Sequence, residues 1–574
     1  MYHKIIQIVL LCALILLPGL SEAEKESGVG DTELLNLMQF ELDRSFKNLK
    51  NADETPIYYM QYAVIENRDF ALAVTNGGLE APISSTLRYL DVDIRVGSPE
   101  LDNTHEIRSD NWRDNYTPRR LVQFPLEADP LAVRTTLWNE TEYKRRKALD
   151  RFTKVKANRQ LKVEEEDTSA DFSAAQAQQF EEIMPEQLFD AEYWRPVLKR
   201  VGQYGAGLPF VKNSSVRLQL TQKTTYMVNT EGTRLQHGAC YIRLFVNFTG
   251  MAEDGMELRR TEGWNAASFG KLPSEEEIMA TSRRLGAELK DLIDAPVVTP
   301  FVGPAILVNR ASGVFFHEIF GHRLEGHRQK SESEGQTFTK MVGKSVLPDF
   351  LDVLDDATLA DFDGIDLRGY YKFDDEGVPA QPVSIVENGV LKEFLLTRSP
   401  IDGFPRSNGH ARRDFGREVV ARMGNTIVRS SKAFEYQKLR EMLIDEIKKQ
   451  EKPYGLIFQD ISGGFTMTGR GGTQAFKVIP LLVYRVFPDG REDEVVRGVD
   501  IVGTPLTSFS KIIATGDDPA VFNGTCGAES GSVPVSAISP SILVSEIEVE
   551  RVRKGQEKPP LLPPPNKKGQ GGAA

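Results

Sequence analysis

The sequence lacks several features that would indicate a function directly. It has no basic stretch interleaved with aromatic residues, and its formal net charge of −12 disfavours non-specific binding to nucleic acid. The glycine-rich segment at residues 469–472 has no Lys-Ser/Thr pair, so it does not indicate a phosphate-binding loop. No internal repeat is found. We therefore expect a protein that does not bind nucleic acid.

Long apolar runs are also absent, apart from one at the N-terminus. Met1–Lys4 carries a positive charge, Ile5–Leu17 is almost wholly apolar, and Ser21–Ala23 offers small residues to a signal peptidase. This pattern predicts a secretory signal peptide at residues 1–23, cleaved after Ala23. An uncleaved anchor is the alternative, but the apolar run is short for a membrane span. We expect an exported protein, periplasmic or extracellular, without a stable membrane span.

Cysteine is scarce. The chain has three, and Cys12 would be removed with the signal peptide, which leaves Cys240 and Cys526. In an oxidising compartment these two could form one disulfide. A thiolate that binds a metal ion is the competing interpretation, and the sequence leaves both open.

The remaining composition is that of an ordinary globular protein. With 574 residues, 40% hydrophobic and 26% charged, the chain is long enough for two or three domains. Helical and strand patterns alternate in the first half, whereas strands and turns dominate after residue 365. This predicts an α+β protein with an N-terminal mixed α/β module and a strand-rich C-terminal domain. The expected divisions are 24–170, 171–295, 296–553 and a disordered Lys/Pro/Gly-rich tail at 554–574.

Several elements can be placed from local patterns. Strands are expected at 57–65 and 70–74. A helical run is expected at 174–201, followed by strands at 216–220, 224–229 and 241–248. Ser274 and Glu277 have the spacing of a capping box, which predicts a helix that begins there and ends before Pro296.

The most informative stretch holds three of the seven histidines. His317-Glu318 followed by His322 reads H-E-x-x-x-H, one residue longer than the H-E-x-x-H zinc motif. On a regular helix, residues five apart point about 140° away from each other, so the two histidines would not share one ion. A π-bulge, or a helix that breaks at Gly321, would bring them together.

Chance spacing is the simpler interpretation of such a pair. Against it, the apolar segments 305–308 and 314–316 lead into the motif, and two histidines beside a carboxylate are costly to bury without a role. A catalytic zinc site needs a third protein ligand and an open position. Cys526, flanked by glycines, is the best candidate for that ligand.

These residues make the chain resemble the TldD/PmbA metallopeptidases. Within that family it resembles the catalytic TldD subunit. The segment 317–326 looks like the family signature, and further blocks follow in the family's order over roughly residues 215–550. These blocks are 374–380, 387–392, 412–413, 422–426, 499–506 and the segment around Cys526. The signal peptide, the charged 129–168 segment and the Pro-rich tail depart from the family and suggest an exported variant.

The resemblance implies a zinc peptidase in which His317, His322 and Cys526 bind Zn²⁺. It also implies a dimer that encloses the site, either a homodimer or a heterodimer with an inactive paralogue. In such an enzyme Glu318 would act as the general base towards an extended peptide substrate.

Other polar residues are candidates for binding the substrate or for surrounding the ligands. Arg412 and Arg413 are candidate substrate-binding residues, with surface salt bridges as the alternative. Glu325 and His327 are expected near the ligands or at the surface. Two rival functions remain: a non-catalytic zinc scaffold or partner subunit of an exported peptidase, and a structural domain with a Cys240–Cys526 disulfide.

Overall fold

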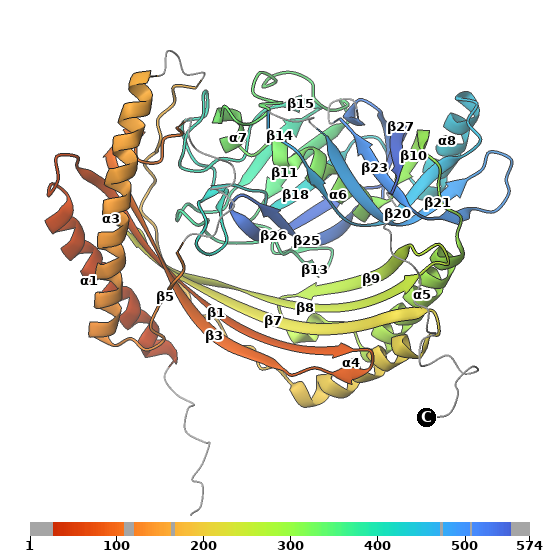
Figure 1. Cartoon of the computed structure of the whole chain (residues 1–574). Coiled ribbons are helices and arrows are strands. Elements are labelled where there is room, and N and C mark those ends of the chain that lie inside the picture. Colours follow the sequence, from red (N-terminus) through yellow and green to blue (C-terminus); the bar gives the residue numbers. More distant parts are fainter. Residues whose placement is uncertain (1–26, 108–119, 162–166, 471–474, 505–507, 553–574) are drawn as a thin grey trace, which may run out of the picture.

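A computed structural model describes residues 27–107, 120–161, 167–470, 475–504 and 508–552. Two domains face each other: a curved sheet with helices on its outer side, and a second domain that lies over the concave side of that sheet (Figure 1). The predicted signal peptide and the tail at 554–574 lie outside the described residues. Within the described part of the chain, no helix combines the length and the apolar character needed to cross a membrane.

The first domain is built on one nine-stranded sheet, antiparallel except where β6 joins β8. The path of the sheet is β4 (Leu101–Asp102), β3 (Ile83–Ser98), β1 (Ile57–Thr75), β7 (Val211–Asn229), β8 (Arg234–Met251) and β6 (Gln179–Glu181). Attached to it are β2 (Gly78–Leu79), β5 (Val122–Gln123) and β9 (Glu257–Ala266). Because β1 pairs with β7, the segments predicted as separate domains, 24–170 and 171–295, share this sheet.

Four helices pack on the convex face of the sheet: α1 (Ser27–Leu49), α3 (Pro130–Leu161), α4 (Ala191–Gly207) and α5 (Glu275–Asp294). On β8, buried Ile242 and Leu244 point towards these helices and alternate with half-buried Tyr241 and Arg243 on the concave face. The predicted capping box at the start of α5 is confirmed, since Ser274 and Glu277 bond each other's backbone N–H groups.

Two local predictions for this domain are wrong in their boundaries. The helical run expected at 174–201 begins only at Ala191, where Asp190 caps the helix by accepting a hydrogen bond from the Tyr193 N–H. The strands expected at 57–65 and 70–74 form one strand, β1. The charged residues between them stay in the sheet because buried Glu66 pairs with Arg88, at 2.6 Å.

The second domain contains an eight-stranded sheet that partly closes on itself. Its path is β10 (Phe301–Leu307), β20 (Gly455–Thr466), β21 (Phe476–Val486), β23 (Val499–Gly503), β27 (Ile542–Arg551), β24 (Ile512–Gly516) and β19 (Ala433–Phe434), with β22 (Glu494–Val496) attached to β21. Strand β10 pairs with both β20 and β27, so five of these strands form a closed ring.

A six-stranded sheet completes the domain: β15 (Val390–Leu391), β14 (Pro382–Glu387), β11 (Leu351–Asp356), β18 (Asn425–Ser430), β26 (Gly531–Ser539) and β25 (Ala520–Ala528) at its edge. Two short hairpins, β12 (Asp361–Phe362) with β13 (Ile365–Asp366) and β16 (Ala411–Arg412) with β17 (Val420–Ala421), lie beside it.

Helix α6 (Asn309–Ile319) contacts strands of both sheets, including β20, β25 and β26. Every residue from Ala311 to Ile319 is buried, so α6 carries His317 and Glu318 into the interior of the domain together with its apolar residues. The turn η2 (Gly321–Arg323) and the short helix α7 (His327–Lys330) follow it.

The strand-rich α+β prediction is confirmed, although it omitted α8 (Tyr436–Lys449). That helix packs Leu439, Leu443 and Ile447 against buried residues of β10 and β20.

Candidate metal centre

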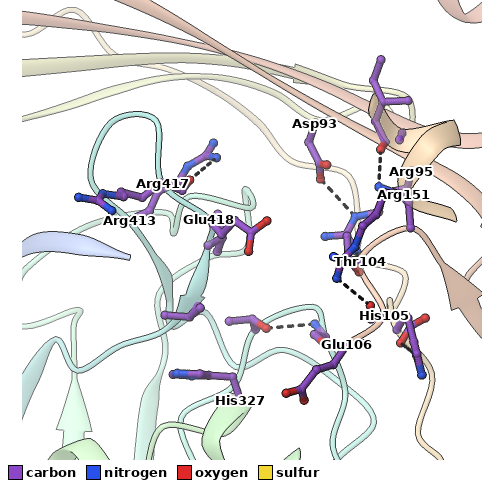
Figure 2. A pocket seen from close by; sticks show the side chains of 18 of the residues that line it. Asp93, Arg95, Thr104, His105, Glu106, Arg151, His327, Arg413, Arg417 and Glu418 are labelled. Carbon is purple, nitrogen blue, oxygen red and sulfur yellow. Dashed lines mark hydrogen bonds and ion pairs between the residues drawn. The ribbon is translucent and has the colours of Figure 1, made fainter. Parts of the chain in front are cut away.

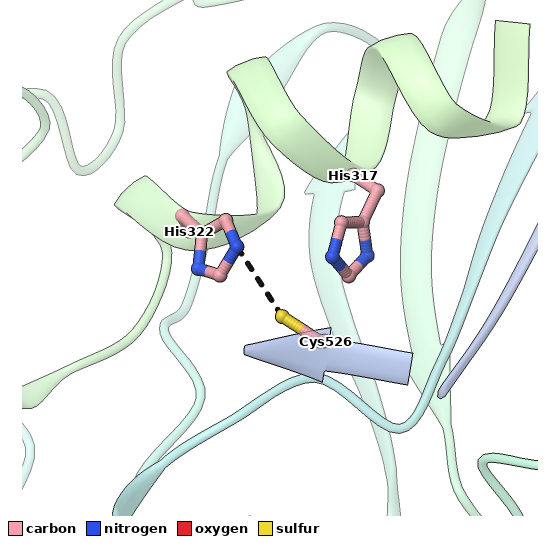
Figure 3. A group of neighbouring side chains, drawn as sticks. All are labelled: His317, His322 and Cys526. Atoms are coloured by element: carbon pink, nitrogen blue, oxygen red, sulfur yellow. Dashed lines mark hydrogen bonds between the residues drawn. The ribbon is translucent and has the colours of Figure 1, made fainter. Parts of the chain in front are cut away.

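The two motif histidines face each other because helix α6 stops between them. The helix ends at Ile319, and η2 turns the chain so that the His317 and His322 rings lie 5.2 Å apart between centroids (Figure 3). The helix break, one of the two predicted solutions, is therefore confirmed. Gly321 is required by packing, because a Cβ there would lie 2.0 Å from the sulfur of Met423.

Cys526 enters the same place from β25. Its Sγ lies 3.3 Å from His322 Nε2, and one ligand atom from each of His317, His322 and Cys526 falls within 4.8 Å of the others. Tetrahedral zinc with Zn–N and Zn–S distances of about 2.0–2.3 Å needs ligand atoms about 3.5 Å apart, so this donor set fits the ion. All three residues are buried.

The alternative disulfide is wrong. Cys240 lies on β8, half-buried, and both cysteines are free thiols. Burial raises the pKa of the Cys240 thiol to about 11, as expected of an inert residue.

Charges within the cluster favour a thiolate. Burial by itself raises the pKa of the Cys526 thiol, but the positive charges of His322, His317 and Arg422 outweigh it and hold that pKa well below its usual range. Burial lowers the pKa of His322, whereas Cys526 and Glu325 raise it well above the ordinary value. A thiolate with two imidazoles is a ligand set that suits zinc.

A buried carboxylate orients His322. Glu325 has no exposed surface, and its Oε1 lies 3.2 Å from His322 Nδ1. The other ring nitrogen, Nε2, is thereby directed at Cys526, the arrangement that typically fixes the tautomer of a metal-binding histidine. Burial raises the pKa of Glu325, but His322 and Arg328 oppose this and bring it to about 2. Glu325 thus lies next to the ligands, as predicted.

Arg422 holds the two sides of the cluster together and was not assigned a role from the sequence. Its Nη2 donates to the Cys526 carbonyl at 2.8 Å and its Nη1 to Ser530 Oγ at 2.7 Å, while its Nε lies 3.4 Å from Glu325. The signal in the sequence was an arginine between Ala421 and Met423, both of which are apolar and buried.

Glu318 follows His317 on α6 and is 8% exposed. It packs against Gly464 of β20, where an added Cβ would come within 2.9 Å of Glu318 Cγ. No hydrogen bond from a described residue reaches its carboxylate, which leaves the oxygens available to accept a proton.

The two candidate substrate-binding arginines occupy different places. Arg412 is buried, donates from Nη1 to the Met423 carbonyl at 2.6 Å, and stacks over Tyr371. Arg413 forms an ion pair with Asp91 of β3, across the two domains. Neither forms the exposed surface salt bridge that was the alternative.

Two further histidines outside the motif, His410 and His105, each lie against a carboxylate. His410 is buried with its Nε2 3.2 Å from Asp355, and His105 Nδ1 lies 2.7 Å from Asp171.

A cavity of about 840 Å³ opens between the domains (Figure 2), and the candidate ligands His317, His322 and Cys526 do not line it. His105, Glu106 and Arg151 line its N-terminal side, opposite Arg413, Glu418 and His327. His327, expected near the ligands or at the surface, lies at the cavity wall and pairs there with Glu529.

An ion-pair chain connects this cavity to the candidate metal ligands. Glu529 also pairs with Arg328 at 2.9 Å, and Arg328 pairs with Glu325 at 2.8 Å. Glu325, His327 and Glu529 are close enough to form a second cluster of ligand atoms. Arginine and histidine already occupy its carboxylates, so we interpret it as an ion-paired network.

Comparison with known proteins agrees with this geometry. Residues 302–551 match the model of the PmbA/TldA metallopeptidase C-terminal domain. The second domain is thus similar to the C-terminal domain of the PmbA/TldA metallopeptidases. The matched segment begins within β10 and ends at the end of β27, so it contains His317, His322 and Cys526.

Several curated proteins that this chain is similar to are metalloproteases by name. A metalloprotease of Methanothermobacter thermautotrophicus is 25% identical over 345 residues, which cover 59% of this chain and 70% of that protein. A TldD homologue of Buchnera aphidicola is 28% identical over 251 residues, which cover 43% of this chain and 47% of that protein. A zinc metalloprotease TldD homologue of Saccharolobus solfataricus is 28% identical over 255 residues, 44% and 52% of the two chains. The chain thus spans only about half of the latter two.

Solved structures extend the likeness to both domains. One is a putative modulator of DNA gyrase from Thermotoga maritima, with a TM-score of 0.58 and 18% sequence identity. The match covers 90% of this chain and 99% of that protein's chain. TldE from Thermococcus kodakarensis matches 90% and 100% with a TM-score of 0.57 at 14% identity. At these identities the matches establish a shared fold.

Proposed function

We propose that the protein is a zinc-dependent peptidase that hydrolyses peptide bonds in extended or unfolded peptides. The observation that carries the proposal is the convergence of His317, His322 and Cys526 beside Glu318. The names of the relatives and the match to the family domain support it.

In this proposal His317, His322 and Cys526 hold the zinc, with Glu325 and Arg422 fixing the two sides of the site. When bound, zinc supplies Lewis acidity for the scissile carbonyl and lowers the pKa of a water molecule towards about 7. Glu318 accepts the proton of the attacking water and then donates it to the leaving amine. Its carboxylate suits this role because it is close to His317 and takes no hydrogen bond from the described residues.

An exposed sheet edge near Glu318 supports an extended substrate. Strand β20 pairs with β10 only over 456–458, so beyond Phe458 that edge pairs with no described strand. The edge passes Glu318 at Gly464, and Phe465 is 49% exposed. A peptide that adds as a strand here would bring backbone carbonyls to the site through main-chain hydrogen bonds.

The purified protein tests the proposal directly. We expect about one zinc per chain by elemental analysis, hydrolysis of an unfolded polypeptide by the protein alone, loss of activity on chelation and recovery with zinc. Zinc without turnover would favour a non-catalytic scaffold or partner subunit. The fold match to TldE is compatible with that alternative, and with a homodimer or a heterodimer. Mixing with a paralogue would then restore hydrolysis.

Export is a separate proposal that rests on the sequence. A mature chain beginning at Glu24 is expected when the protein is isolated from its host and its N-terminus is sequenced. An intact Met1 on protein from the cytosol would contradict it.

Glu325→Gln should weaken zinc binding by about 10–100-fold, because His322 loses the carboxylate that orients it. Competition against a chromophoric chelator measures this affinity. Glu334→Gln is the matched control, since Glu334 also pairs with Arg328, at 2.9 Å, but does not touch His322. Equal zinc affinity in the Glu325 variant and in the wild type would show that Glu325 does not orient the ligand.

A further inference from the structure

Three large apolar side chains are exposed beside the free edge of β20. Phe465 lies on β20, Met467 follows the end of that strand, and Ile479 lies on the neighbouring strand β21. These side chains are 38–56% exposed, and we call the three residues the apolar patch. Single apolar side chains are common on any protein surface, whereas a group of them next to a functional site marks a surface that binds something.

The apolar patch lies on the outer face of its sheet. Val478 and Phe476 of β21 are buried in the core, and they pair with positions 464 and 466 of β20. Because side chains alternate along a strand, Phe465 and Met467 point to the opposite, outer face. Ile479 follows Val478 on β21 and therefore points outwards as well, opposite position 463. The patch thus extends over two neighbouring outward positions of β20 and one of β21.

The edge of β20 beside the patch is bounded at both ends by backbone hydrogen bonds. At one end the Val308 N–H donates to the Phe458 carbonyl, at 3.0 Å, and at the other end the Gly335 N–H donates to the Thr468 carbonyl, at 2.7 Å. Between these contacts no described strand pairs with that edge. Alternate residues of a strand direct their backbone groups to the same edge, so those of positions 464 and 466 also point to it. The edge therefore offers unpaired donors and acceptors to an added strand.

Arg323 fixes this edge relative to the candidate metal ligands. It follows His322 in the η2 turn, is buried, and donates to Thr466 Oγ1 at 2.8 Å and to the Met467 carbonyl at 3.2 Å. Glu318 packs against the same strand two positions before Thr466. A peptide that lies about 4.8 Å from β20 along this edge would have the proposed base on its inner side and the apolar patch on its outer side.

We propose that the apolar patch binds apolar side chains of the peptide substrate, at two positions that are two residues apart. Side chains on the outer face of an added strand lie next to Phe465 and Met467 as cross-strand neighbours, and burying a large apolar side chain there is favourable. The proposal rests on the proposed peptidase function, because it assigns the substrate class of that site.

A second copy of this chain is the competing occupant of the patch. A stable protein–protein interface buries about 800 Å² on each partner. Three side chains that are about half exposed supply roughly 300 Å², since a large side chain buries about 150–250 Å² when it is fully covered. The small area, together with the unpaired edge and the proposed base beside it, favours a peptide over a second copy.

The test uses unfolded peptides that are identical except for one residue, which is Leu or Gln at each position in turn. Mass spectrometry of the products from the zinc-loaded protein locates the cleaved bond. Wild type should prefer Leu by about 10-fold in kcat/KM at two positions that are two residues apart. Phe465→Thr should remove the preference at one of these positions. Ile83→Thr, at an exposed position on β3 of the other domain, is the matched control and should keep both.

A binding measurement separates this inference from the proposed function. Fluorescence anisotropy of the same labelled peptides on the Glu318→Gln protein reports affinity without turnover. If wild type hydrolyses no peptide but the Leu forms bind more tightly and Phe465→Thr removes the difference, the peptidase proposal fails and the apolar site stands.

Equal binding of the Leu and Gln forms at every position, or a preference that survives Phe465→Thr, overturns the apolar site. A surviving preference together with a change in oligomeric mass on gel filtration would assign the patch to a second copy. Met467→Gln, checked like Phe465→Thr by thermal unfolding, provides a second variant at the same patch and should remove the preference at the other position.

Discussion

Replacing Cys526 with serine should remove both zinc and peptidase activity. The substitution exchanges a charged, soft ligand for a neutral hydroxyl in the middle of the ligand set, where Sγ lies 3.3 Å from His322 Nε2. Losing a residue that only orients a metal ligand lowers metal affinity by about 10–100-fold. Losing the ligand itself should lower zinc affinity by more than that. Elemental analysis after gel filtration and a chelator competition measure it.

Cys240→Ser is the matched control for this prediction. Cys240 is a half-buried thiol on β8 and is not part of the ligand cluster, so the variant should keep its zinc and its turnover. The Cys526 variant should still fold, because Arg422 bonds the backbone carbonyl at position 526 and serine retains that group. Full zinc occupancy in the Cys526 variant would refute the ligand assignment.

Glu318→Gln should lower kcat by about 10²–10⁴-fold and leave the zinc content unchanged. Glutamine keeps the size of the side chain beside Gly464 but cannot take the proton of the attacking water. Steady-state kinetics on an unfolded polypeptide, with zinc analysis of the same sample, separate the two effects.

The control for Glu318→Gln is Glu435→Gln, at an exposed position just before α8. It makes the same chemical change far from the ligands and should leave kcat and zinc unaffected. A Glu318 variant that hydrolyses peptides at the wild-type rate would exclude Glu318 as the base, whatever its zinc content.

Local sequence patterns predicted those elements whose causes are local. The start of α5 follows from Ser274 and Glu277, which are three residues apart, and the helix break near Gly321 follows from the spacing of His317 and His322. Cys526 lies 204 residues after His322, so only its glycine-rich surroundings and the family resemblance identified it.

Contacts between residues that are far apart in the sequence could not be predicted from local patterns. Nothing near Glu66 shows that Arg88 neutralises it, so the single strand β1 was interpreted as two. Arg422 acquires its role from the Cys526 carbonyl on β25, more than a hundred residues further along the chain. Arg412 was expected near substrate or at the surface, and its burial against Tyr371 depends on the tertiary packing of β16.

The pairing of β1 with β7 also determines the order in which the chain can fold. Residue 61 lies opposite residue 229, so β1 leaves the ribosome long before its neighbour has been made. Such a high contact order slows folding and leaves an unpaired strand exposed in the nascent chain. A fragment that ends near residue 170 lacks this neighbour, so we expect it to aggregate when expressed alone and to be rescued by co-expression of the rest of the sheet.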